Sequence, residues 1–107
     1  MSEKPFTVSV SDDQLQLLLT KLRTTRLPDE LDGSSWDYGV PLENVKRLVD
    51  RWGNGFDWRK VEAKINLIPQ FTRDIPVEGF ESINIHYIHQ KSTLDTAIPL
   101  LFAHGCR

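Results

Sequence analysis

The sequence predicts an α+β fold in which helices come first and a sheet begins after them. Up to residue 68 the apolar residues recur at helical spacing, which indicates amphipathic helices around a long loop. After Pro69 the apolar period changes to two, which is typical of strands. A chain of 107 residues is long enough for one domain at most. We therefore divide the chain into a helical segment, residues 1–68, and the first strands of a sheet, residues 69–107.

The first helix is expected to begin at Ser11, after a segment from Pro5 to Val10 that should form a short strand or an extended arm. Ser11 and Gln14 fit a capping box, and Asp12 and Asp13 place acidic charge in the first turn, where the helix dipole favours it. The leucines that follow recur at helical spacing and predict one apolar face: Leu15, Leu18, Leu19 and Leu22. Pro28 is expected to stop this helix.

Residues 29–40 are expected to form a loop that contains the motif WDYG, Trp36 to Gly39. Two large aromatics in a loop usually pin it to an apolar surface. Pro41 suits the first turn of a second helix, which residues 53–55 (Gly-Asn-Gly) should end. Asp57 is a plausible cap for a third helix that Pro69 closes.

Three strands are expected in the second half. Residues 71–77 and 83–89 should form a hairpin around a turn at Glu78-Gly79. Residues 98–103 are nearly all apolar, which is typical of a strand that is buried on both faces. Such a strand needs parallel neighbours and covering helices.

Composition excludes several function classes. The net charge of −2 provides no basic surface for nucleic acid or anionic lipid. One cysteine, Cys106, rules out an internal disulfide, and the first residues lack the apolar stretch of a signal peptide. No stretch approaches the length of a membrane span. These observations predict a soluble, cytoplasmic protein.

Titratable residues give weak signals for chemistry. His86 and His89 lie three apart on an expected strand, so they should point to opposite faces and not share a metal ion. Asp57 is better interpreted as a helix cap and Glu62 as a solvated helix residue than as a catalytic carboxylate pair. Cys106 has no identifiable base and is expected to be a plain exposed thiol.

Five aromatic side chains could form a ligand-binding box, but packing is the commoner role at such spacings. We therefore predict that they are structural anchors: Trp36, Tyr38, Trp52, Phe56 and Trp58.

Several motifs together resemble the N-terminal region of the microsomal-type epoxide hydrolases of the α/β-hydrolase superfamily. The resemblance covers nearly the whole chain, and five motifs occur in the family order. They are WDYG (36–39), FDWRKVEAKIN (56–66), PQFTRDI (69–75), INIHYIH (83–89) and AIPLLFAHG (97–105). The resemblance implies that the helices and the loop wrap around a catalytic core and its lid. It also implies that the hairpin and the run at residues 98–103 begin an α/β-hydrolase sheet.

The resemblance implies a reaction that adds water to an epoxide and gives a vicinal diol through an aspartyl ester, without a cofactor or metal. His104 and Gly105 match the start of the HGxP motif, whose turn helps to build an oxyanion hole. The family's nucleophile, base and tyrosines lie downstream of that motif, so we expect this chain to be inactive alone and to meet an epoxide only within a full-length parent.

The last two residues depart from the family pattern, because Cys106 and Arg107 stand where an aromatic and a proline are usual. This departure is the basis of a hypothesis that the chain leaves the family reading frame there, through a retained intron or a gene-model error. The alternative function is a non-catalytic module that packs on a full-length hydrolase or on itself. A product that does not fold is a third interpretation.

Overall fold

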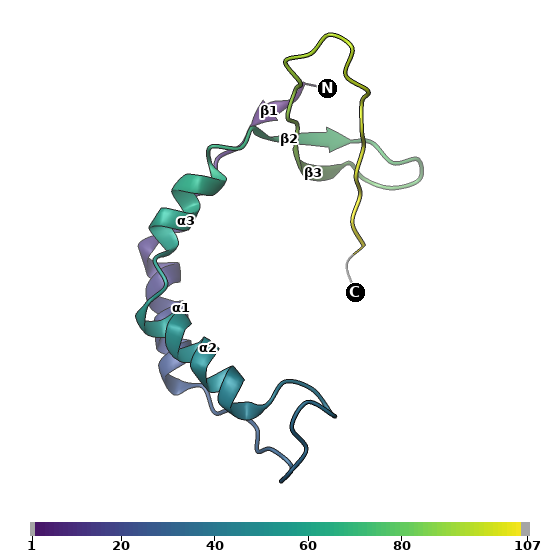
Figure 1. Ribbon diagram of the computed structural model, residues 1–107. Coiled ribbons are helices and arrows are strands. Elements are labelled where there is room, and N and C mark those ends of the chain that lie inside the picture. The colour runs from purple at the N-terminus through teal and green to yellow at the C-terminus, as the bar shows by residue number, and fades with distance from the viewer. Residues whose placement is uncertain (1, 106–107) are drawn as a thin grey trace. The chain divides into compact units, whose positions relative to one another are not determined.

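The structure is a computed structural model that describes residues 2–105, and the chain divides into two compact units (Figure 1). Residues 7–67 form the helical unit, and residues up to 6 join those from 68 onward in the sheet unit. The helical unit contains α1 (Asp12–Thr24), α2 (Leu42–Asn54) and α3 (Trp58–Ile65). The sheet unit contains β1 (Lys4–Pro5), β2 (Gln70–Ile75) and β3 (Ile83–Ile88).

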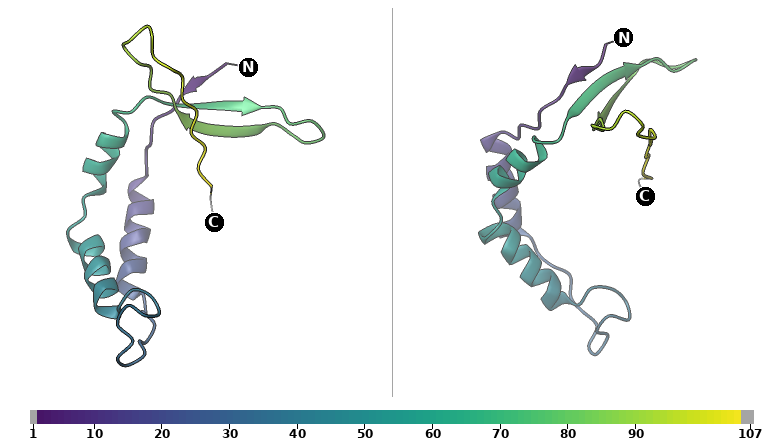
Figure 2. Two further views of the ribbon diagram at one scale, coloured as in Figure 1. Left: turned by 45° about the vertical axis from the view of Figure 1, so that its right-hand side comes forward. Right: turned by 45° about the horizontal axis from the view of Figure 1, so that its top comes forward.

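The helix α1 begins where the capping signal predicts. The Gln14 backbone N–H donates to Ser11 Oγ at 3.3 Å, and Asp12 and Asp13 lie in the first turn. The helix ends at Thr24, earlier than Pro28, because the chain is already extended at Thr25. The helices α1 and α2 contact each other and lie side by side in the left view of Figure 2.

The loop before α2 contributes to the start of that helix. Pro41 occupies the N-cap position and offers no side-chain cap. Instead, Glu30 Oε1 accepts a hydrogen bond from the Leu42 N–H at 2.9 Å, and a carboxylate there also complements the helix dipole. At the other end the Gly55 N–H donates to the Arg51 carbonyl. The predicted start and end of α2 are therefore confirmed.

The helix α3 is capped by Asp57, as predicted. Asp57 Oδ1 accepts from the Lys60 N–H at 3.2 Å. At the C-terminus the Asn66 N–H donates to the Glu62 carbonyl, and Asn66 keeps helical backbone angles.

The sheet is three-stranded and antiparallel, in the order β1-β2-β3. The register of β2 and β3 runs from Gln70 opposite Ile88 to Ile75 opposite Ile83. This confirms the predicted hairpin. Its turn also agrees, because the Phe80 N–H donates to the Val77 carbonyl.

Aromatic side chains gather on the sheet. Phe71 and Tyr87 are opposite each other, with ring centroids 6.1 Å apart, which is a favourable cross-strand pair. The Tyr87 hydroxyl donates to the carboxylate of Glu3, and this hydrogen bond raises the pKa of Tyr87.

The apolar run at residues 98–103 differs from its prediction. Its residues form no strand, and Leu101 is 93% exposed. The third strand of this sheet is the N-terminal β1, which pairs with β2 through Lys4 and Pro5. A strand that is apolar on both faces forms only between neighbours that pair with it and cover it. The described residues supply no such neighbours.

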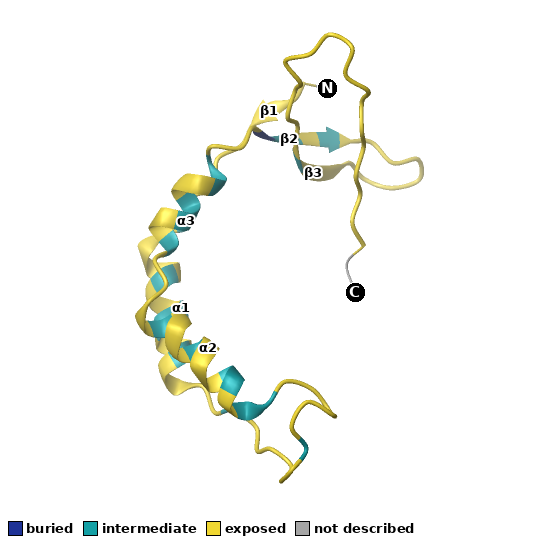
Figure 3. Cartoon of the chain, viewed as in Figure 1, coloured by how far each residue is buried: buried dark blue, intermediate teal, exposed yellow. Residues whose placement is uncertain are grey.

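Apolar side chains are open to solvent throughout the described residues (Figure 3). No hydrophobic residue among residues 2–105 is buried, and the one buried side chain is polar: Gln70 is 5% exposed. Secondary structure is therefore held here mainly by caps, hydrogen bonds and half-buried contacts. Across residues 2–105, no helix combines the length and apolar character that crossing a bilayer would need.

Candidate functional site

The helical unit carries an apolar groove of about 490 Å³. Side chains from α1, α2 and the start of α3 line it, and we call it the helix groove: Leu18, Leu48, Arg51, Trp52, Phe56 and Trp58. Arg51 is the one charged residue among them. A concave surface of aliphatic and aromatic side chains is suited to bind an apolar partner.

Three of the five predicted anchors meet in this groove. Trp52 and Phe56 are 47% and 45% exposed, and Trp58 is half-buried. A second hollow of about 300 Å³ adjoins the groove and shares these three side chains with Leu15 and Leu18 of α1. The three aromatic side chains thus contribute to a surface shared with α1 and α2, and each remains partly exposed to solvent.

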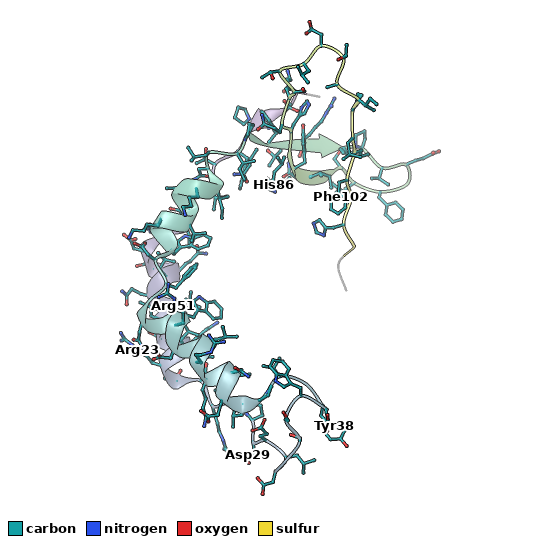
Figure 4. All side chains as sticks on the ribbon, in the orientation of Figure 1. Arg23, Asp29, Tyr38, Arg51, His86 and Phe102 are labelled. Carbon is teal, nitrogen blue, oxygen red and sulfur yellow. The ribbon has the colours of Figure 1, made fainter. Side chains whose placement is uncertain are left out.

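The other two anchors lie apart, on the loop before α2. Trp36 is 63% and Tyr38 is 84% exposed. Tyr38 lines a separate hollow of about 310 Å³ with other loop residues, and Figure 4 shows its side chain on the loop, away from the groove. The structure does not bring all five aromatics into one box.

Polar side chains of α3 and of its C-cap residue Asn66 hold the extended arm that precedes α1. Asn66 makes two hydrogen bonds to Val8, one to its N–H and one to its carbonyl, each at 2.8 Å. The Val10 N–H donates to Glu62 Oε2 at 2.8 Å, and Arg59 Nη1 donates to the Val10 carbonyl at 2.7 Å. We call Arg59, Glu62 and Asn66 the arm clamp.

Glu62 is the centre of the arm clamp. Its side chain is 13% exposed and accepts hydrogen bonds from Val10, from Trp58 Nε1 at 3.0 Å and from Arg59 Nη1 at 2.8 Å. The backbone hydrogen bond from Val10, and then the bonds from Arg59 and Trp58, lower the pKa of Glu62. The interpretation of Glu62 as a solvated residue is therefore wrong, because the arm covers it.

A signal for the arm clamp was present in the sequence. Residues 59, 62 and 66 follow the spacing of three and four that places side chains on one helix face. Nothing local shows what this polar face binds, because the arm lies about fifty residues earlier in the chain.

The two strand histidines have separate structural partners. His86 Nε2 lies 3.0 Å from Gln70 Oε1, and its ring centroid is 4.7 Å from that of Phe6 (Figure 4). His89 follows β3 and lies edge-on to Phe71 at 6.4 Å. Among residues 2–105, no three His, Cys, Asp or Glu side chains are grouped so that they could hold a metal ion.

The predicted oxyanion turn does not lie in a pocket among the described residues. His104 and Gly105 are exposed and lie on irregular chain, two and three residues after the exposed Phe102, which Figure 4 labels. Cys106 and Arg107, where the sequence departs from the family pattern, lie outside the described residues.

Comparison with known proteins identifies relatives for both units. Residues 3–106 match the family described as epoxide hydrolase N terminus. The chain is 33% identical to a putative epoxide hydrolase of Stigmatella aurantiaca and covers 22% of that protein. It is 35% identical to epoxide hydrolase 1 of Sus scrofa and covers 23% of that protein. These alignments use 94% and 97% of this chain.

Solved structures of epoxide hydrolases also resemble this chain. The structure of Aspergillus niger epoxide hydrolase matches 92% of this chain at a TM-score of 0.73 with 34% identity, and the match covers 25% of that protein. Juvenile hormone epoxide hydrolase of Bombyx mori matches 89% of this chain at a TM-score of 0.75 with 20% identity, which shows the fold alone; 22% of that chain is covered. This chain therefore belongs to the family of epoxide hydrolase N-terminal regions and spans about a quarter or less of the relatives that it matches.

Proposed function

We propose that this chain supplies the N-terminal region of an enzyme that hydrolyses epoxides, and that its helix groove packs against the hydrolase domain of that enzyme. One observation carries the proposal: a chain of this family presents an apolar, aromatic-lined groove of about 490 Å³ and buries no hydrophobic residue among residues 2–105. Side chains of this kind gain most from burial, at about 25 cal/mol per Å² of apolar surface removed from water.

The resemblance supplies the reaction. Water adds to an epoxide, one C–O bond of the ring breaks, and a vicinal diol is the product after an aspartyl ester forms and is hydrolysed. The N-terminal region contributes structure to this reaction. In the proposed arrangement, Trp52, Phe56 and Trp58 anchor the helices, while Trp36 and Tyr38 anchor the loop.

We assign His104 and Gly105 to the oxyanion turn of the complete enzyme and expect no activity from them in this chain alone. In the family motif they begin the turn whose backbone N–H groups stabilise negative charge on oxygen. An oxyanion donor accelerates nothing without a nucleophile placed beside it. In this structure His104 is exposed and lies outside helices and strands.

The first prediction concerns the purified chain. We expect no formation of diol from an aryl epoxide above the buffer rate, measured by chromatography of the product. Turnover that survived repurification and disappeared in His104→Ala would contradict the proposal, because catalysis would then reside in this chain.

A second candidate function is a non-catalytic module that packs on a complete hydrolase or on a second copy of this chain. The exposed run at residues 98–102 and the edge of β3 favour it, because an unpaired edge can accept another strand. A defined dimer of the purified chain, measured by sedimentation equilibrium, would support this module.

A further inference from the structure

We propose that the arm clamp of α3 is a binding site for extended polypeptide main chain, and that residues 7–10 are a strap that it fastens through main-chain atoms. This inference concerns how the helical unit closes, and it stands independently of any epoxide chemistry. No feature of the family resemblance assigns a role to Arg59, Glu62 or Asn66.

The geometry of the bonds indicates main-chain recognition. All four hydrogen bonds from the arm clamp to the strap reach the N–H and carbonyl groups of Val8 and Val10. In extended chain, alternate residues direct their main-chain groups to the same side, as they do in an antiparallel ladder. The clamp therefore engages the strap with the periodicity that a neighbouring strand would use.

Side chains on one helix face take the place of that neighbouring strand. The Asn66 amide both accepts from and donates to Val8, as a residue of a paired strand does. Glu62 and Arg59 divide the same two tasks at Val10, and both bonds there involve a charged group. Charge-assisted hydrogen bonds are roughly twice as strong as neutral ones.

The ligand class follows from these contacts. The site accepts an extended segment that has a free N–H and a free carbonyl at two alternate positions. Proline lacks the N–H, so it is excluded at positions 8 and 10 and compatible with position 9, where the clamp makes no hydrogen bond and the side chain is exposed.

Fastening the strap has a consequence for the helix groove. The strap leads directly into α1 through the cap at Ser11, and Arg59 also forms an ion pair with Asp12 in the first turn of α1. The clamp thus holds the helix that carries Leu15 and Leu18, which line the groove and the hollow beside it. If the strap detaches from the clamp, α1 loses this attachment, and the side of the groove that α1 forms can move.

Proline substitutions in the full chain test the proposal. Native-state hydrogen exchange is followed by mass spectrometry for residues 7–11, with residues 42–54 of α2 as an internal reference for folding. In Val10→Pro we expect the remaining strap amides to exchange about tenfold faster or more, because a hydrogen bond to a charged acceptor is lost. The matched control Ser9→Pro should exchange within about threefold of wild type, since no clamp bond is removed there.

Asn66→Ala provides a second test that leaves every main-chain atom of the strap in place. We expect the Val8 amide to lose its protection by about tenfold while α2 exchanges as in wild type. If Val10→Pro also accelerates exchange in α2, that variant has disturbed the fold. Asn66→Ala then decides whether the clamp protects the strap.

Two results would overturn the proposal. One is equal acceleration in Val10→Pro and Ser9→Pro with α2 unchanged, because the clamp would then not distinguish position 10 from position 9. The other is an unchanged Val8 amide in Asn66→Ala.

Discussion

At the scale of single residues, Glu62 connects three parts of the helical unit. Its carboxylate receives the Val10 N–H from the strap, the Trp58 indole from α3 and the guanidinium of Arg59. These donors favour the charged form, so the pKa of Glu62 lies below its ordinary value. The helix groove shares Trp58 with this cluster.

The lowered pKa predicts how the strap responds to acid. A carboxyl group whose folded pKa is depressed contributes stability that is fully present above the unfolded pKa, about 4.3 for glutamate. That contribution is lost as the pH falls through the lower folded value. We therefore expect the Trp58 indole N–H resonance to shift towards its strap-open position only below about pH 4.3. An NMR titration from pH 7 to 3 measures the chemical shift of this N–H.

Glu62→Gln is the control for this titration. Glutamine keeps an oxygen that can accept from Val10 but has no proton to gain, so the shift of the Trp58 resonance in this pH range should disappear. A midpoint at or above the ordinary glutamate value, or the same transition in Glu62→Gln, would contradict the assignment.

At the scale of elements, the hairpin depends on the backbone of one glycine. Gly79 has φ +81° and lies third in the turn from Val77 to Phe80. A residue with a Cβ pays about 1–2 kcal/mol to adopt such a left-handed conformation. Open space around the added Cβ means that the cost is conformational and not steric contact.

We predict that Gly79→Ala destabilises the hairpin by about 1–2 kcal/mol. Hydrogen exchange of the β3 amides in the full chain measures this as an acceleration of about 5- to 30-fold. The neighbouring substitution Glu78→Ala is the control, because Glu78 has a negative φ and should leave the exchange rates almost unchanged. Equal rates in the two variants would show that the turn does not limit hairpin stability.

The elements also show which parts of the fold the sequence could predict. The starts of α1 and α3 were predictable because Ser11 and Asp57 act on N–H groups three residues away. The hairpin was predictable because its turn and its period of two are local. These signals do not depend on the rest of the molecule.

Features that depend on distant partners could not be predicted in the same way. The sequence pattern of residues 5–10 indicates a short strand or an extended arm, but it cannot show the pairing of Lys4 with Thr72, because these residues lie far apart in the chain. The local sequence favours a solvated Glu62 for the same reason, because its partner Val10 is 52 positions away. The run at residues 98–103 has the composition of a buried strand, and composition alone does not provide the neighbours that such a strand needs.

At the scale of the whole molecule, the described residues bury no hydrophobic side chain and leave many large ones exposed. The exposed large hydrophobic residues occur in both units, and in the helical unit they line the helix groove. Monomeric proteins rarely leave large contiguous apolar patches open, so such surfaces indicate a partner. The relatives are about four times as long as this chain, and we propose that their hydrolase domain is the partner.

Leu17 and Leu18 provide a matched pair for testing this partner. They are neighbours on α1, but Leu18 lines the helix groove, whereas Leu17 is 54% exposed and does not. If the groove is covered by the hydrolase domain, Leu18→Ala should destabilise the assembled enzyme by about 2–5 kcal/mol, as large-to-small changes in a packed interior do. Leu17→Ala should have little effect on it.

The most direct measurement is epoxide turnover by a chimera in which residues 3–105 of this chain replace the matching region of Aspergillus niger epoxide hydrolase. We predict that the chimera forms diol while the same enzyme without that region does not, and that Leu18→Ala lowers its melting temperature much more than Leu17→Ala. A chimera no more active than the enzyme lacking the region, or one whose melting temperature responds equally to both substitutions, would contradict the account.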